Sequence, residues 1–159
     1  MTTNKQVLKF VEDSVALCKP EKVVWITGEE AQLEELRQEA LSTGEIIKLN
    51  EDLLPNCYLH LSDVNDVARV EGRTFICCKD KDDAGPINNW MDPQEAYSKV
   101  GEIFDGAMKG KTMYVIPFSM GAVGSPFSKA GIEITDSIYV VISMKIMTRI
   151  GQSVLDALG

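Results

Sequence analysis

Few side chains in this sequence combine the type and the position that chemistry requires, and Arg69 is the first of them. It ends a predicted short helix in the segment 66–74, Asp-Val-Ala-Arg-Val-Glu-Gly-Arg-Thr, just before a glycine break. A guanidinium offers a rigid fork of donors that suits a carboxylate or a phosphate, and it stays charged at any working pH. The alternative is a cation at a helix C-terminus that pairs with Glu71 or Asp66, and the local spacing alone favours this ion pair.

The other titratable groups that stand out predict structural roles. His60 lies among alternating apolar residues, which is typical of an ordinary strand position. Asp63 and Asp66 are three residues apart near a predicted helix start, where acidic groups favour the helix dipole. Cys77 and Cys78 lie on a predicted strand and would point to opposite faces. With one histidine and no Cys-x-x-Cys pair, we predict no catalytic side chain and no metal site.

The segment 106–112, Gly-Ala-Met-Lys-Gly-Lys-Thr, ends like a phosphate-binding loop but has three residues between its glycines where that motif has four. A phosphate loop also follows a strand and opens a helix, whereas this segment leaves a predicted helix and enters a predicted strand. The sequence therefore predicts no nucleotide site here.

Composition and charge narrow the classes of partner. The chain has 159 residues and a formal net charge of −8, which disfavours nucleic acid and anionic lipid as partners. Its hydrophobic content of 45% and charged content of 25% are typical of a globular chain. No apolar run is long enough to cross a membrane, and no secretory signal is recognisable. We therefore expect a cytoplasmic protein whose cysteines stay reduced, most of them as small buried side chains.

Hydrophobic periodicity predicts alternating helices and strands, followed by strands that pair with one another. The first expected helix opens with a Thr3–Gln6 capping box and stops before Pro20. A later helix is capped by Asp92, has Pro93 and Glu95 in its first turn, and runs to Ala107. The other expected helices cover 29–41, 63–68 and 148–158. The expected strands are 22–27, 46–49, 57–61, 74–78, 112–118, 131–134 and 138–147, with a loop at 79–89. Late strands without intervening helices favour antiparallel pairing. The predicted fold class is α/β with an α+β tendency, as a single domain over residues 1–159 with a mixed sheet.

Several stretches, in order along the chain, carry a resemblance to a known family. They are 56–59, 66–71, 83–86, 88–93, 108–126, 131–137, 146–149 and 157–159. Together they resemble the N-terminal part of GTP-dependent phosphoenolpyruvate carboxykinase, and they span nearly the whole chain but only a minor fraction of that family's length.

The resemblance implies an enzyme that interconverts oxaloacetate and phosphoenolpyruvate with carbon dioxide, using GTP and Mn²⁺ or Mg²⁺. It also implies that the phosphate loop, the metal ligands and the guanine pocket lie beyond Gly159, in a C-terminal domain that is this chain's partner. Arg69 matches the family's substrate-contacting arginine, and Glu71 matches a position near its mobile lid. Lys145 stands where arginine is common in the family, which removes a bidentate fork there.

From this resemblance we expect a chain that binds neither GTP nor a metal ion and is inactive alone. Two other functions stay open. One is a stand-alone module that binds a small dicarboxylate through Arg69, and the other is an interaction domain without catalysis.

Overall fold

The computed structural model describes residues 2–66 and 70–159, which form an α/β fold with a mixed sheet. The helices are α1 (Lys5–Cys18), α2 (Glu30–Thr43), α3 (Pro93–Phe104), α4 (Ile138–Met147) and α5 (Gln152–Leu158), with short 3-10 helices η1 (Glu71–Arg73) and η2 (Lys81–Ala84). The strands are β1 (Lys22–Trp25), β2 (Ile47–Lys48), β3 (Tyr58–Leu59), β4 (Phe75–Ile76), β5 (Asn89–Trp90), β6 (Thr112–Met120), β7 (Lys129–Thr135) and β8 (Arg149–Ile150). The predicted fold class is confirmed.

β6 is the central strand of the main sheet. β1 pairs with it in parallel, with Lys22 opposite Thr112, and β7 pairs with it antiparallel along almost its whole length. β8 is antiparallel to β6 near its C-terminal end, with Phe118 opposite Ile150. The predicted antiparallel pairing is therefore confirmed for the strands expected over 112–118 and 131–134.

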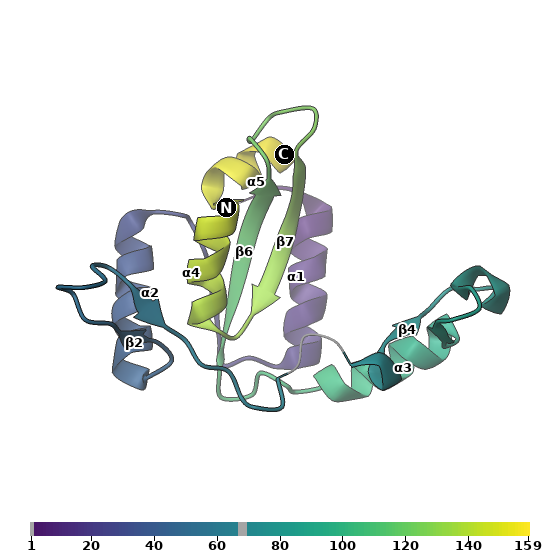
Figure 1. Ribbon diagram of the computed structural model, residues 1–159. Coiled ribbons are helices and arrows are strands. Elements are labelled where there is room, and N and C mark those ends of the chain that lie inside the picture. The colour runs from purple at the N-terminus through teal and green to yellow at the C-terminus, as the bar shows by residue number, and fades with distance from the viewer. Residues whose placement is uncertain (1, 67–69) are drawn as a thin grey trace.

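Helices cover both faces of this sheet, and alternate residues of β6 point to the two sides. Met113 and Val115 pack with Val11 and Cys18 of α1. The residues of the opposite core come mainly from α2, α4 and β6 and are Ile26, Leu33, Leu36, Ala40, Ile46, Tyr114, Ile116, Ile138, Val141 and Ile150. Figure 1 shows α1 on one side of β6 and β7, and α4 and α2 on the other.

The C-terminal ends of β1 and β8 meet on the same edge of β6, and this meeting brings two backbones unusually close. Gly151 N–H donates to Pro117 O at 2.9 Å, and Gln152 N–H donates to Thr27 O at 3.0 Å. Gly28 and Gly151 have φ of +82° and +103°, and a Cβ on Gly151 would lie 2.0 Å from Thr27 O. Only glycine fits such a contact, because it has no Cβ and adopts positive φ without strain.

The segment 70–104, which we call the arm, lies away from the main sheet (Figure 1). Within it β4 and β5 form a short parallel pair, and α3 follows. The C-terminal end of α3 is tied to α1, because Gly106 N–H donates to Leu17 O at 2.8 Å and Lys19 forms an ion pair with Asp105. The Lys19 ammonium lowers the pKa of the Asp105 carboxyl below its ordinary value, first through its hydrogen bond and then through its charge.

The strand predicted over 138–147 is wrong, because these residues form α4. Ser137 is its N-cap, and the Glu45 carboxylate accepts from Ser137 Oγ at 2.6 Å and from Tyr139 N–H at 2.9 Å. The segment is apolar nearly all round, so periodicity could not distinguish a strand from a buried helix. These caps, one of them supplied from a distant part of the chain, satisfy the first amides of the helix.

Helix boundaries differ from the predictions at three further places. Asn4, not Thr3, caps α1: its side chain accepts from Gln6 N–H and Val7 N–H, while its amide donates to Leu158 O at 2.9 Å. The predicted last helix is interrupted, since 149–150 form β8 before α5 begins. Of the helix predicted over 63–68, residues 63–66 form a turn and no helix.

The arm departs from the predictions in smaller ways. The predicted loop 79–89 contains the single turn η2, and Cys77 and Cys78 follow β4 rather than lie within it. Asp92 caps α3 through Gln94 N–H and Glu95 N–H as predicted. Helix α3 ends at Phe104, three residues before the predicted end.

Within the described parts of the chain, no helix has the length and apolar character needed to cross a membrane.

Replacing Gly151 by alanine tests the close approach of β1 and β8. The new Cβ would meet Thr27 O at 2.0 Å, and since the backbone must then move, we expect the free energy of unfolding to fall by about 3 kcal/mol or more. Gly110→Ala is the matched control, because Gly110 has φ of +74° but open space around it, and we expect it to lose only about 1–2 kcal/mol. Urea unfolding followed by circular dichroism measures both losses, and equal losses would contradict this account.

Candidate functional site

Arg69, the residue that the sequence predicts to hold a substrate, lies outside the described residues. The turn before it is described: Asp66 N–H donates to Asp63 O at 2.9 Å, and Asn65 N–H donates to Asp63 Oδ1 at 2.8 Å. Asp63 therefore stabilises a tight turn. This corrects the prediction that Asp63 and Asp66 lie at the start of a helix and interact favourably with its dipole.

The segment directly after Arg69 is held by hydrogen bonds to β5. Asn89 Nδ2 donates to Glu71 O at 2.8 Å and to Thr74 O at 3.2 Å, and Thr74 Oγ1 donates to Val70 O at 2.8 Å. Glu71 itself opens η1 and is exposed. One amide side chain thus fixes the backbone that follows the predicted substrate arginine.

The histidine has a structural role, as the sequence analysis favours. His60 Nδ1 is 2.7 Å from Glu45 O, and its ring stacks on Tyr139 at 3.9 Å between centroids. Since Glu45 also caps α4, His60 belongs to the contact between the start of α4 and the segment that follows β3.

Neither a nucleotide cradle nor a metal cluster is found where the structure describes the chain. The segment 106–112 lies between the end of α3 and the start of β6, so it leaves a helix and enters a strand, as predicted. Residues 2–66 and 70–159 contain no group of three or more His, Cys, Asp or Glu side chains that could hold a metal ion. The described residues therefore offer no such cluster for the divalent metal that the resemblance implies, and the segment 106–112 lacks the strand-to-helix context of a phosphate loop.

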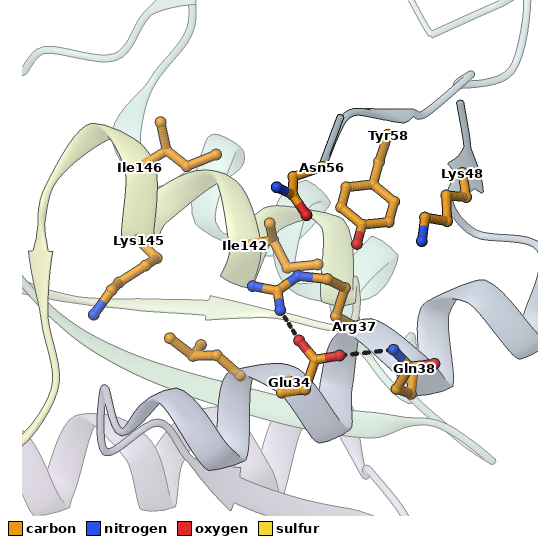
Figure 2. Close-up of a pocket in the computed structure, with 10 residues that line it drawn as sticks. Glu34, Arg37, Gln38, Lys48, Asn56, Tyr58, Ile142, Lys145 and Ile146 are labelled. Carbon is orange, nitrogen blue, oxygen red and sulfur yellow. Dashed lines mark hydrogen bonds and ion pairs between the residues drawn. The ribbon is translucent and has the colours of Figure 1, made fainter. Parts of the chain in front are cut away.

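A pocket of about 470 Å³ between α2, α4 and the β2–β3 pair gathers several polar side chains that the sequence analysis did not single out. Figure 2 shows Arg37 between Lys48 and Lys145, which lie toward opposite ends of the pocket. The lining residues are Leu33, Glu34, Arg37, Gln38, Lys48, Asn56, Tyr58, Ile142, Lys145 and Ile146. They come from four elements and a loop, so no local spacing in the sequence could have indicated them.

Two of the three cationic side chains of this pocket, Arg37 and Lys48, form ion pairs with nearby glutamates. Arg37 pairs with Glu34 and, at 3.5 Å, with Glu30. A hydrogen bond from Gln38 and the charge of Arg37 hold the pKa of Glu34 below its ordinary value.

Lys48 and Lys145 differ in how they are held. Lys48 pairs with Glu51 at 2.8 Å, whereas Lys145 donates to Gly28 O at 3.3 Å. The pocket lining contains no serine, cysteine or histidine among the described residues, so it holds no serine–histidine or cysteine–histidine pair for nucleophilic catalysis. Asp66 and Val70, which are the nearest described residues to the 67–69 segment, do not line it.

Comparison with known proteins gives the family. A family profile described as "Phosphoenolpyruvate carboxykinase N-terminal domain" matches residues 9–159. The chain belongs to this family. Curated relatives named "Phosphoenolpyruvate carboxykinase [GTP]" are 51% identical over 158 residues in Anaeromyxobacter sp. (strain K) and in Corynebacterium kroppenstedtii, and 51% identical over 157 residues in Chlamydia muridarum. Each match covers 99% of this chain but only 25–26% of the relative.

This member of the phosphoenolpyruvate carboxykinase N-terminal family therefore spans about a quarter of the length of the curated relatives it matches. The family assignment confirms the resemblance stated from the sequence. It does not test the roles predicted for Arg69 and Glu71, which stay predictions.

The four cysteines of this family member are all free and differ in exposure. Cys18 is buried, Cys78 is half-buried, and Cys57 and Cys77 are exposed. The expectation that most are buried is therefore wrong, since the short segments around Cys57 and Cys77 do not join the main sheet. Burial, and secondarily the charge of Asp136, raises the pKa of the Cys18 thiol.

We expect this difference to appear in alkylation by N-ethylmaleimide. Cys18 is buried with a raised pKa, and since only an exposed thiolate reacts, it should react about tenfold or more slowly than Cys57 and Cys77 under native conditions. The rates are measured by mass spectrometry of peptides from timed samples. All three thiols should react alike in denaturant, whereas equal rates without denaturant would contradict the burial of Cys18.

Proposed function

We propose that this chain is the substrate-side, N-terminal part of a GTP-dependent phosphoenolpyruvate carboxykinase. The full enzyme converts oxaloacetate and GTP to phosphoenolpyruvate, carbon dioxide and GDP. The observation that carries the proposal is the 51% identity to enzymes of that name, which extends over 99% of this chain. In this proposal residues 1–159 form one domain, and a C-terminal catalytic domain completes the protein.

Arg69 has the central role in the proposal. Its guanidinium would bind a carboxylate of oxaloacetate or phosphoenolpyruvate by charge-assisted hydrogen bonds and so orient the substrate. The bonds from Asn89 Nδ2 to Glu71 O and Thr74 O support this role, because they fix the backbone that follows Arg69. Glu71, two positions later in the chain, is exposed, and we propose that it contacts the lid of the complete enzyme.

The phosphoryl transfer belongs to the absent part of the enzyme in this proposal. We assign no step of the transfer to this chain. The helix-to-strand context of segment 106–112, and the absence of a cluster of three or more metal-ligating side chains among the described residues, support this choice. GTP and Mn²⁺ or Mg²⁺ would bind to the C-terminal domain, and residues 1–159 alone would be inactive.

We further place the protein in the cytoplasm, where free thiols such as its four cysteines persist. Its partners would be the small dicarboxylate substrate and its own C-terminal domain. The net charge of −8 supports neither nucleic acid nor an anionic membrane surface as a partner.

Replacing Arg69 by alanine in the full-length enzyme tests the proposal. A charge-assisted contact contributes about 1.5–3 kcal/mol, so we expect kcat/KM for oxaloacetate to fall about ten- to a hundredfold or more. Arg73→Ala is the matched control, because Arg73 is an exposed arginine of η1 only four positions away, and it should leave kcat/KM nearly unchanged. Steady-state kinetics with oxaloacetate as the varied substrate measures both.

An unchanged kcat/KM in the Arg69→Ala enzyme would remove the assignment of this residue. Equal losses in both variants would show a general loss of positive charge rather than a specific contact. A reading frame that ends after Gly159 would favour the dicarboxylate-binding module over the enzyme.

A further inference from the structure

The arm has an apolar surface with nothing packed against it. Among residues 70–104, all of which are described, Ala84 is the only buried one. Its exposed large apolar side chains are Phe75, Ile76, Ile87, Tyr97, Val100, Ile103 and Phe104. Because these side chains remain in water, the arm gains little stability from their burial. An exposed apolar surface of this kind is typical of an interaction site.

Helix α3 carries most of this exposed apolar surface. Tyr97, Val100, Ile103 and Phe104 lie on one face of the helix, and Tyr97 and Ile103 are 77% and 73% exposed. The opposite face is polar and carries an ion pair between Glu95 and Lys99 at 2.5 Å. The helix therefore has the amphipathic pattern of a packed helix but none of its residues is buried.

The same face is hollowed. Cys77, Pro93, Ala96, Tyr97 and Val100 line a groove of about 320 Å³ where the first turns of α3 meet the segment that follows β4. Its lining carries no charged side chain among the described residues, so it suits an apolar side chain rather than a polar one.

The rest of the described chain is placed so that it does not cover this surface. Among the described residues, the C-terminal end of α3 is tied to the body through Gly106 N–H to Leu17 O and the Lys19–Asp105 ion pair. Figure 1 shows the arm extending from this attachment away from β6 and β7.

We infer that the apolar face of α3, together with the groove beside Cys77, is the surface on which the remaining three quarters of the full-length chain docks. This inference rests on the proposed function, because the occupant is the part of the enzyme that follows residue 159. The curated relatives supply its length, since this chain covers only 26% of them. A second copy is a poorer occupant, because each copy carries a net charge of −8 and two copies would repel each other. The docked segment presents aliphatic or aromatic side chains, one of them in the groove.

Cys77 is a natural reporter of this docking. It lines the groove and is exposed in residues 1–159, so in the full-length protein we expect N-ethylmaleimide to alkylate it about tenfold or more slowly than in the 159-residue chain. The comparison uses the same reagent concentration and pH. Peptide masses separate Cys77 from Cys57, and fragment ions from tandem mass spectrometry distinguish Cys77 from the adjacent Cys78. Rates within about twofold in the two proteins would overturn the inference.

A charge placed in the docking face gives a second, independent test. Val100→Asp puts a carboxylate on that face, whereas Ser98→Asp puts the same charge on the opposite, exposed side of α3. In the full-length protein Val100→Asp should restore fast alkylation of Cys77, and Ser98→Asp should leave it slow. In the 159-residue chain both variants should alkylate as fast as the parent. Identical effects of the two substitutions in the full-length protein would overturn the inference.

Two other outcomes would also overturn the inference. One is a Cys77 rate in the 159-residue chain that falls as protein concentration rises, with a dimer in sedimentation velocity, which would make a second copy the occupant. The other is a reading frame that ends after Gly159. Because the readout is thiol reactivity and not turnover, a failed Arg69 assignment leaves this test unaffected, and a failed docking test leaves the Arg69 kinetics unaffected.

Discussion

The structure depends on the central strand β6, because β1 and β8 both form hydrogen bonds with the same edge of this strand. β6 is buried from Met113 to Pro117, and its hydrogen-bonding groups on that edge are used first by β1 and then by β8. The ends of these two strands therefore meet backbone to backbone at Gly28 and Gly151, where side chains do not fit. α2 follows this junction on one side and α5 on the other, so a short contact between two glycine-bearing turns fixes where both helices begin.

Much of this fold is predictable from local patterns, and the exceptions share one physical cause. The amphipathic pattern of α2 and α3 and the caps Gly44 and Asp92 are local, and the sequence predicts both helices. For α4 the deciding groups are not local: Glu45 caps a helix that starts more than ninety residues later in the chain. Asn4 similarly takes part in a contact with Leu158 that no local spacing indicates. Tertiary hydrogen bonds thus decided the elements that periodicity left ambiguous.

The candidate site is predictable to a smaller extent. Residue type and position alone single out Arg69, but the local spacing favours an ion pair, and only the resemblance to the carboxykinase family implies a substrate contact. The comparisons confirm the family without testing the residue. The role of Asn89 in holding residues 71–74 was not predicted, because its partners are fifteen and eighteen positions away. Nor was the pocket around Arg37, whose lining comes from separate elements. The exposed face of α3 is the opposite case: the amphipathic pattern indicates a buried face, but none of the residues of this helix is buried.

In the division of labour proposed here, this chain supplies Arg69 and a docking surface, and the C-terminal domain holds the triphosphate and its metal ion. The most direct test of this division of labour is phosphoenolpyruvate formation from oxaloacetate and GTP, with Mn²⁺ present, by the purified 17.6 kDa chain. We expect a rate no higher than that of the same mixture without protein, while the full-length enzyme turns over under identical conditions. Turnover proportional to the concentration of the 159-residue chain, in a preparation free of host carboxykinase, would contradict it.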